Sequence, residues 1–482
     1  MQLKDPTLLR EQCFVGGKWI GTPETEVTDP ATGAVIARVP RFGTAEAKAA
    51  IATAHAALPG WSRKTGKERA NILRKWFELI VANRDDIALI MTTEQGKPLA
   101  EAAGEVDYAA SFVEFNGEEA KRIYGETSQS HRADARIVVV KQPIGVVGAI
   151  TPWNFPAAMI TRKCAPALAA GCTVVCKPAG ETPLTALELA ALAERAGIPP
   201  GVFNLITGKA SAIGEELTTS PLVNCIAFTG STEVGKLLMR QAASTVKKVA
   251  LELGGNAPFI VFDDADIDSA VEGAIFSKFR NMGQTCICAN RILVQDKVYD
   301  AFAAKLAVGV KALKVGNGTE PGVVQGPLIN MAAVEKVEHH IADAVGKGAE
   351  VAVGGHRHKL GGTFFEPTVL KNVTAAMLIT NEETFGPVAP LYRFHSEQEA
   401  IDMANATEFG LAAYFYARDI GRVWRVGEGL EYGMIGINSG AISTELAPFG
   451  GVKESGLGRE GSHYGVEEFV EVKYMLMGGL DR

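Results

Sequence analysis

The chain lacks any long uninterrupted run of apolar residues. No stretch approaches the roughly 18 apolar residues that a membrane-spanning helix needs. Residues 1–21 are charged early and contain no continuous apolar segment of the kind found in export signals. The chain also lacks a block of basic residues, and its formal net charge is −7. These absences argue against a membrane protein and against a protein that binds nucleic acid.

Cysteine is scarce, odd in number and widely spread, with 7 residues in a chain of 482. This distribution is unlike the paired framework of a disulfide-rich secreted protein. Cys286 and Cys288 are separated by one residue and have no His nearby, whereas metal sites usually use Cys-x2-Cys or longer spacing. We therefore expect free thiols, a cytoplasmic location and no bound metal.

The composition is that of an ordinary globular protein, with 47% apolar residues, 21% charged residues and 52 glycines. Roughly the first 120 residues have mostly helical periodicity. From residue 171 onward, short β-branched runs alternate with helical patterns, and residues 266–281 continue as a helix. This alternation predicts parallel sheets covered by helices, in two α/β domains that meet near residues 253–257. Residues 466–480 alternate like a strand without an evident partner, which could pair with another subunit.

Three polar residues stand in segments that suit covalent chemistry. Cys286, in GQTCICAN, is either a buried structural thiol or a nucleophile. Glu252 ends an apolar strand before a Gly-Gly turn, where it is either a general base or a carboxylate that caps the turn or pairs with a lysine. Asn154, in TPWNFP, is either an oxyanion donor or an ordinary turn residue. Each segment alone leaves both alternatives open.

Two further segments are compatible with nucleotide contacts. In FTGSTEVGK a strand ends at Gly230 and a helix begins near Ser231, so backbone N–H groups could meet a phosphate there. The spacing is not G-x-G-x-x-G, so this is a weak fingerprint. In VVCKPAGETP, Lys177 follows a strand and could reach a ribose or phosphate, or could simply lie on the surface.

Together and in order, seven segments resemble the aldehyde dehydrogenase superfamily over nearly the whole chain: TPWNFP, CKPAGETP, FTGSTEVG, LELGGNAPFIV, GQTCICAN, EETFGP and APFGGVKESGLGRE. Within it they are most similar to bacterial succinate-semialdehyde dehydrogenases, and nearly as similar to glutarate-semialdehyde dehydrogenases. The resemblance implies an α/β fold, a homodimer or homotetramer, and three parts: a Rossmann-like NAD(P)-binding domain (1–125 and 144–254), an α/β catalytic domain (255–455) and a small β oligomerisation arm (126–143 and 456–482).

The resemblance also implies a mechanism. Cys286 attacks the aldehyde, and the Asn154 amide and the backbone N–H of Cys286 hold the resulting oxyanion. Hydride leaves to the nicotinamide, and Glu252 then activates the water that hydrolyses the thioester. Cys288 is either a passive neighbour or a redox partner of Cys286, since the matching pair forms an inhibitory disulfide in some relatives.

Cofactor contacts carry over from the resemblance in the same way, to Trp153, Asn154, Lys177, Gly180, Gly230, Ser231, Leu253, Glu383 and Phe385. Many NAD-dependent members have a glutamate where this chain has Gly180, and NADP-using bacterial relatives have a serine. Glycine removes a carboxylate that would repel the 2′-phosphate, with Lys177 as counter-charge. The neighbouring Glu181 could restore that repulsion. We therefore expect NADP to be favoured and NAD to be accepted.

For the substrate, Arg162, Arg280 and Ser443 match residues that bind the carboxylate of semialdehydes in these relatives. They would serve a four-carbon or a five-carbon semialdehyde, so the expected reaction is oxidation of succinate semialdehyde, with glutarate semialdehyde or a broader range of aldehydes as alternatives. A cofactor-independent cysteine esterase or thioesterase is an alternative of a different class, and a non-catalytic structural protein is another. Phosphorylating or CoA-acylating chemistry is disfavoured by the presence of Glu252.

Overall fold

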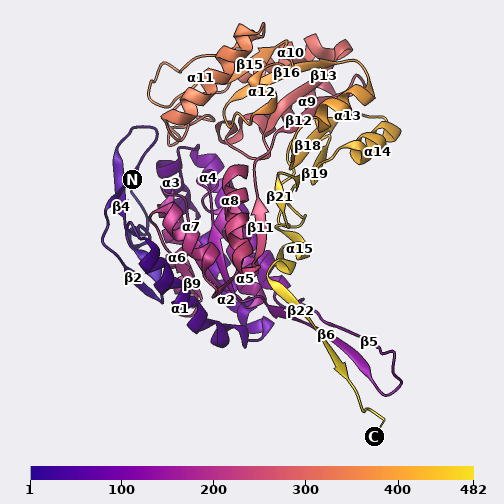
Figure 1. The fold of residues 1–482 in the computed structure, drawn as a ribbon. Helices are drawn as coiled ribbons and strands as arrows, with labels where there is room; N and C mark the ends of the chain where they lie inside the picture. Colours follow the sequence, from indigo (N-terminus) through magenta and orange to yellow (C-terminus); the bar gives the residue numbers. More distant parts are fainter. Residues whose placement is uncertain (1, 482) are drawn as a thin grey trace.

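Two sheets of mainly parallel strands organise the molecule, and a narrow arm projects from one end (Figure 1). The structure is a computed structural model that describes residues 2–481. The mixed α/β architecture expected from the sequence is confirmed. The division into three domains at the residue boundaries given above stays a prediction.

The first sheet has eight strands in the order β2-β1-β9-β8-β7-β10-β11-β21. The five strands from β9 to β11 in this order run parallel. Strand β1 pairs antiparallel with β9, β2 pairs antiparallel with β1, and β21 pairs antiparallel with β11. The chain passes from β7 outward to β8 and β9, then returns to β10 on the other side of β7. The bounds are β1 (Cys13–Val15), β2 (Lys18–Ile20), β7 (Val146–Ile150), β8 (Thr173–Lys177), β9 (Phe203–Leu205), β10 (Val223–Thr229), β11 (Lys248–Glu252) and β21 (Gly456–Leu457).

Helices cover this sheet. The crossover helices are α5 (Ala158–Ala170), α6 (Pro183–Ala196), α7 (Ala210–Thr219) and α8 (Thr232–Ala242), and the N-terminal helices are α1 (Thr44–Ser62), α2 (Gly66–Ala82), α3 (Arg84–Gln95) and α4 (Leu99–Glu119). Helix α8 begins as expected, with Ser231 as N-cap accepting from the backbone N–H of Val234. Short 3-10 turns occur at η1 (Pro6–Leu8) and η2 (Ala243–Thr245).

The second sheet has seven strands in the order β14-β15-β16-β13-β12-β18-β19, all parallel except β14. Its strands are β12 (Ala257–Val261), β13 (Ala289–Gln295), β14 (Glu350–Val353), β15 (Thr368–Lys371), β16 (Val388–Phe394), β18 (Ala412–Tyr416) and β19 (Met434–Ile437). Its helices are α9 (Ile267–Phe279), α10 (Asp296–Lys311), α11 (Met331–Gly346), α12 (Leu378–Asn381), α13 (Glu397–Asn405) and α14 (Ile420–Gly429), and η3 (Arg280–Gly283) follows α9. Strands β17 (Phe409–Gly410) and β20 (Val452–Lys453) form a small separate pair.

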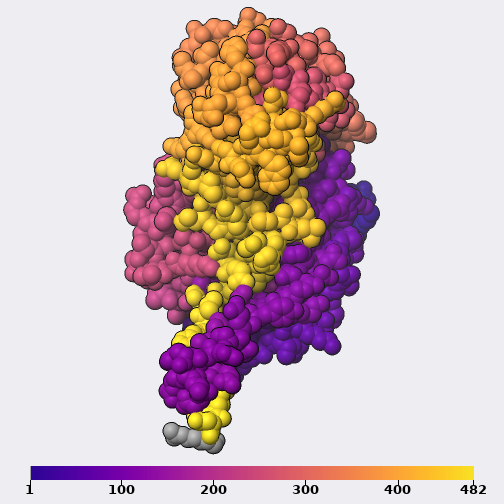
Figure 2. Space-filling model, turned by 90° about the vertical axis from the view of Figure 1, so that its right-hand side faces the viewer, coloured from indigo at the N-terminus to yellow at the C-terminus, as the bar shows by residue number. Residues whose placement is uncertain are grey.

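The projecting arm is a three-stranded sheet made of β5 (Glu126–Gln129), β6 (Arg136–Pro143) and β22 (Val470–Met477), and α15 (Ser462–Glu467) precedes β22. Figure 2 shows its two distant segments side by side at the lower end of the molecule. The predicted terminal strand therefore has a partner in its own chain, because β22 pairs with β6 along eight residues.

Two sequence-based expectations were wrong in detail. The first 42 residues contain four short strands rather than helices: β1, β2 and the hairpin of β3 (Thr25–Thr28) and β4 (Val35–Val39). These strands have three to five residues each, too few for a clear alternating pattern. The helix expected over residues 266–281 ends at Phe279, because Asn281 and Met282 adopt left-handed backbone angles.

Candidate active site

The candidate site lies where the carboxyl ends of the first sheet meet the amino ends of the second. Strands β7 and β10 are neighbours at the point where the strand order reverses. Such a switch point is where open α/β sheets bind ligands. It brings the segment after β7, with Trp153 and Asn154, beside the segment after β10, with Gly230 and Ser231. Lys177 ends the adjacent strand β8.

The second sheet contributes the cysteine. Strands β12 and β13 start together, with Ala257 paired to Ala289, and Cys286 lies just before β13. The Gly-Gly turn after Glu252 packs against the backbone of Cys286. A Cβ on Gly255 would lie 2.3 Å from the carbonyl oxygen of Cys286, so only glycine permits this approach. Segments that are distant in sequence are thus in contact.

Asn154 is fixed from both its side chain and its backbone. Its Nδ2 donates to the carbonyl of Gln284 at 3.0 Å. Its own carbonyl accepts from Lys97 Nζ at 2.7 Å and from Asn281 Nδ2 at 2.9 Å. These contacts hold the amide beside the cysteine segment, which is what a preorganised oxyanion donor requires.

Lys97 and Glu105 support this arrangement and were not singled out from the sequence. Their side chains form a fully buried ion pair. Glu105 Oε1 also accepts from the backbone N–H groups of Ala157 and Ala158 at the start of α5, at 3.0 and 3.2 Å. In the sequence they are two of several charged residues in or beside the helical pattern of residues 97–125, so nothing marked them as a buried pair.

The turn before the cysteine is strained. Asn281 has a φ of 51° and Met282 a φ of 58°, and a left-handed backbone is unfavourable for a residue such as Met. Four hydrogen bonds overdetermine the position of Asn281. Its N–H donates to Glu101 at 2.8 Å, its Nδ2 donates to Asn154, its Oδ1 accepts from Gln95 at 3.0 Å, and its carbonyl accepts from Gln284 at 3.1 Å.

The thiol of Cys286 is held in its neutral form in the free protein. Burial, together with the negative charges of Glu383 and Glu252, raises its pKa to about 12, although Arg162 opposes the rise. Cys288 is buried, and its thiol donates to the carbonyl of Lys278 at 3.3 Å. No disulfide joins any of the seven cysteines, all of which lie in the described residues.

Glu252 is buried at the end of β11, and its Oε2 has no hydrogen-bond partner among residues 2–481. Burial raises its pKa well above the usual value, and the neighbouring carboxylate of Glu460 adds to the rise, while Arg162 and Lys163 oppose it. A carboxyl group in this state can take a proton from water near neutral pH more readily than an exposed one.

Gly180, Lys177 and Leu253, expected from the sequence to contact the cofactor, follow or end strands of the first sheet. A Cβ on Gly180 would meet no atom within 4 Å, so the space beside it is open. The side chain of Lys177 is buried; burial lowers its pKa, and Glu181 is near enough to oppose that shift. Leu253 is buried, and its N–H donates to the carbonyl of Ser455 at 2.9 Å.

Glu383 and Phe385 close the site from the second sheet. Glu383 Oε1 accepts from the N–H of Gly255 at 3.4 Å, and burial raises the pKa of Glu383 to about 8. The ring of Phe385 packs edge-on against Trp153, with centroids 5.6 Å apart. The Gly-Gly turn therefore contacts both Glu383 and Cys286.

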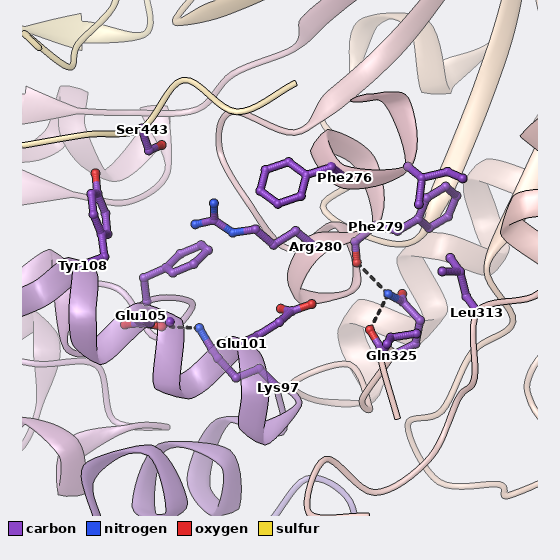
Figure 3. A pocket seen from close by; sticks show the side chains of 14 residues that line it. Lys97, Glu101, Glu105, Tyr108, Phe276, Phe279, Arg280, Leu313, Gln325 and Ser443 are labelled. Carbon is purple, nitrogen blue, oxygen red and sulfur yellow. Dashed lines mark hydrogen bonds and ion pairs between the residues drawn. The ribbon is translucent and has the colours of Figure 1, made fainter. Parts of the chain in front are cut away.

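A cavity of about 430 Å³ opens between α4 and α9, and its walls are mostly apolar (Figure 3). Arg280 and Ser443 both line it. A smaller cavity of about 100 Å³ shares these two residues and reaches Thr285 and Ile287, on either side of Cys286. Cys286 itself lines neither cavity.

The two candidate substrate arginines differ in their partners. The guanidinium of Arg162 lies 2.6 Å from the carboxylate of Glu460, which also pairs with Lys163. Arg162 does not line either cavity. Arg280 has no ion pair and no hydrogen bond from its side chain to any of residues 2–481, and its guanidinium lies 4.8 Å from the ring centre of Phe155. Glu460, within the segment GLGRE, was not singled out from the sequence.

Within the described part of the chain, no helix is both long and apolar enough to cross a membrane. The same residues contain no cluster of three or more His, Cys, Asp or Glu side chains that could hold a metal ion.

Residues 19–475 match the model of the aldehyde dehydrogenase family. The chain is 62% identical to a 3-sulfolactaldehyde dehydrogenase of Pseudomonas putida and to a glutarate-semialdehyde dehydrogenase of Pseudomonas aeruginosa, with 100% of each chain covered in both cases. It is 61% identical to an NADP(+) succinate-semialdehyde dehydrogenase of Escherichia coli, covering 99% of this chain and 100% of that one. The solved structure of a succinate-semialdehyde dehydrogenase from Burkholderia pseudomallei is 63% identical, with a TM-score of 0.98 over 99% of this chain and 100% of that chain.

Proposed function

The chain belongs to the aldehyde dehydrogenase family, and we propose that it oxidises short aldehydes whose far end carries an acid group, with succinate semialdehyde as the first candidate. The observation that carries this proposal is Arg280, a half-buried cation without an anionic partner in residues 2–481, on the wall of the cavity beside the cysteine segment. A desolvated guanidinium favours a carboxylate strongly. A neutral aldehyde would leave it uncompensated.

Arg280 and Ser443 would bind the acid group together, since both line the two cavities. Arg162 would contribute less than the sequence suggested, because Glu460 already balances its charge. Arg162 lies near both Cys286 and Glu252, and its positive charge opposes the rise in the pKa of each group. This favours a role in stabilising the thiolate and the carboxylate during the reaction.

The reacting end would meet the cysteine. The Cys286 thiol loses its proton to solvent and the sulfur adds to the aldehyde carbon, and the resulting oxyanion accepts from Asn154 Nδ2 and from the N–H of Cys286. After oxidation leaves a thioester on Cys286, Glu252 takes a proton from the water that attacks it. Bound NAD(P) supplies the hydride acceptor for this sequence.

The nucleotide-side residues fit such a cofactor. Ser231 starts α8, where free N–H groups and the helix dipole favour phosphate. Glu383 presents a carboxylate, as hydrogen bonds to ribose hydroxyls require, and Trp153 and Phe385 form an aromatic wall nearby. The open space at Gly180, next to the cation of Lys177, supports NADP as the favoured cofactor, with NAD accepted.

Glutarate semialdehyde remains the second candidate substrate, because a relative at 62% identity acts on it. A further relative at the same identity acts on 3-sulfolactaldehyde, so the shared feature is an aldehyde with an acid group at the far end. An esterase without a cofactor would leave the open space at Gly180 and the buried carboxylate of Glu383 without a use.

The arm supports a homodimer or homotetramer. Val472, Tyr474 and Met477 of β22 expose 66%, 57% and 51% of their surface. Apolar side chains in such numbers on one strand favour contact with another subunit. Sedimentation analysis would distinguish the two assemblies from a monomer.

The proposal is tested by initial rates with succinate semialdehyde, glutarate semialdehyde and butanal, each with NAD and NADP. We expect kcat/KM for at least one acidic substrate to exceed that for butanal by about 100-fold or more, as loss of a charged hydrogen-bonded partner implies. Arg280→Met should abolish most of that preference. Arg41→Met, at an exposed arginine without an ion pair within residues 2–481, is the matched control. Equal rates on acidic and neutral aldehydes would refute the proposal.

A further inference from the structure

Tyr108 lies on α4 and lines the larger cavity opposite Arg280. In Figure 3 its ring stands beside the cavity with the hydroxyl directed toward Ser443, and the guanidinium of Arg280 points toward the same region. The ring packs edge-on against Phe112, with centroids 5.0 Å apart, which fixes its orientation. Tyr108 was not among the residues singled out from the sequence.

The hydroxyl of Tyr108 is buried and makes no hydrogen bond within 3.5 Å to any of residues 2–481, although the hydroxyl of Ser443 lies close enough to affect its pKa. A buried hydroxyl without a partner is costly and uncommon in native proteins. Burial raises the pKa of Tyr108, while the nearby charges of Arg162 and Arg280 and the hydroxyl of Ser443 oppose that rise. The phenol is therefore neutral at physiological pH and carries a proton that it can donate.

We propose that Tyr108 Oη donates a hydrogen bond to the terminal acid group of the substrate, as a third donor beside Arg280 and Ser443. This inference rests on the proposed function and adds a specificity-determining residue to it. The three donors come from α4, η3 and the segment after β19, so they approach the acid group from different sides.

The donor acts on selectivity as well as affinity. An acid group satisfies the buried hydroxyl, whereas an aldehyde with a methyl group at the same position leaves it unpaired. Because the phenol is neutral, it adds this discrimination without a second free positive charge in the cavity. The contact is distant from the reacting carbon, so it contributes to binding of substrate and transition state alike and appears mainly in KM.

The test compares Tyr108→Phe with the unaltered protein, since Phe keeps the contact with Phe112 and removes only the hydroxyl. We expect KM for succinate semialdehyde to rise about tenfold or more, as a hydrogen bond to a charged group implies, with kcat within about twofold. The inhibition constant of succinate, which has the acid group but no aldehyde, should rise by a similar factor. Kinetics with butanal should not change.

Tyr124→Phe, at a tyrosine that is 69% exposed, is the matched control and should change none of these values. If the unaltered protein does not prefer acidic aldehydes to butanal, the proposed function fails. If it does prefer them and Tyr108→Phe leaves KM and succinate inhibition unchanged, the role of Tyr108 alone is overturned. An equal loss on both substrates, with a lowered melting temperature, would assign Tyr108 a structural role and would also overturn the inference.

Discussion

Asn154 Nδ2 donates to the backbone carbonyl of Gln284 at 3.0 Å, and this hydrogen bond joins the first sheet to the segment that carries Cys286. The side-chain amide is held before any substrate arrives. The backbone carbonyl of Asn154 is fixed as well, because it accepts hydrogen bonds from Lys97 and Asn281. Preorganised donors of this kind stabilise a developing oxyanion because they need no reorganisation during the reaction.

Asn154→Ala should therefore lower kcat by roughly 100- to 1,000-fold, the usual cost of removing one oxyanion donor. The variant keeps the backbone contacts of residue 154 but loses the buried hydrogen bond from Nδ2 to Gln284, so the melting temperature should fall by a few degrees at most. Steady-state kinetics and thermal unfolding check both expectations. Retention of more than a tenth of kcat would remove Asn154 from the oxyanion site.

The raised pKa of Cys286, about 12, predicts slow alkylation of the free protein at neutral pH. The thiolate is the reactive form, so raising the pKa lowers its fraction at any pH below that value. The rate of inactivation by iodoacetamide should keep rising from pH 7 to pH 10 without a plateau. A plateau below pH 9 would show that the thiol is activated without substrate or cofactor. Cys286→Ser measures the background labelling of the other cysteines.

Glu252→Gln should separate the two halves of the reaction. The amide cannot accept a proton from water, so the thioester on Cys286 should accumulate. Rapid mixing should then show a burst of reduced cofactor close to one equivalent per site, followed by turnover lowered by about 100-fold or more. Unchanged turnover would exclude Glu252 as the base for hydrolysis.

Gly180→Glu tests the cofactor preference. A Cβ at this position meets no atom within 4 Å, so the substitution begins in open space. Its carboxylate should repel a 2′-phosphate and raise KM for NADP by about tenfold or more relative to NAD. Gly180→Gln has the same size without the charge and serves as the control. If the ratio of KM for NADP to KM for NAD is unchanged in Gly180→Glu, the 2′-phosphate of NADP does not bind beside residue 180.

Glu188, on α6, is fully buried, and neither carboxylate oxygen has a hydrogen-bond partner in residues 2–481. Burial, and then the charges of Asp86 and Glu94, raise its pKa well above the usual value for a glutamate. A raised folded pKa means that the folded state holds the proton more tightly than the unfolded state. The contribution of Glu188 to stability is therefore fully present below about pH 4.5 and is lost as pH rises through the folded pKa.

Glu188→Met should stabilise the protein at pH 7 by about 1–3 kcal/mol, because it removes a buried polar group of similar volume. The gain should grow toward pH 9, where the unaltered carboxyl is increasingly forced to ionise. Thermal unfolding between pH 5 and pH 9 measures this difference. A lower melting temperature for the variant across the whole range would contradict the prediction.

The order of helices and strands between residues 171 and 311 followed from the sequence, because short β-branched runs and helical periodicity are both local signals. The left-handed turn at Asn281 and Met282 could not be predicted in this way. Its conformation depends on the hydrogen bonds that Asn281 donates to Glu101 and Asn154 and accepts from Gln95, all of which lie far away in the sequence. Tertiary contacts override local preference there.

For the candidate site, too, some residues could be predicted from the sequence and others could not. Cys286, Glu252 and Asn154 could be named from motifs, because each stands out in its own segment. The pairing of Arg162 with Glu460 could not, since it depends on two segments that only the fold brings together. The unpartnered hydroxyl of Tyr108 is likewise invisible in the sequence, where the residue occupies one position in an amphipathic helix.

The last segment of the chain completes both the arm and the site. Strand β21 pairs with β11 opposite Glu252, Glu460 neutralises Arg162, and β22 pairs with β6. During synthesis on the ribosome, Asn154, Glu252 and Cys286 all emerge before these partners. Until translation of the segment is finished, β6 has an open edge and Arg162 lacks its counter-ion. A chain that lacks this segment therefore exposes the edge of β6, which is open to pairing with another chain.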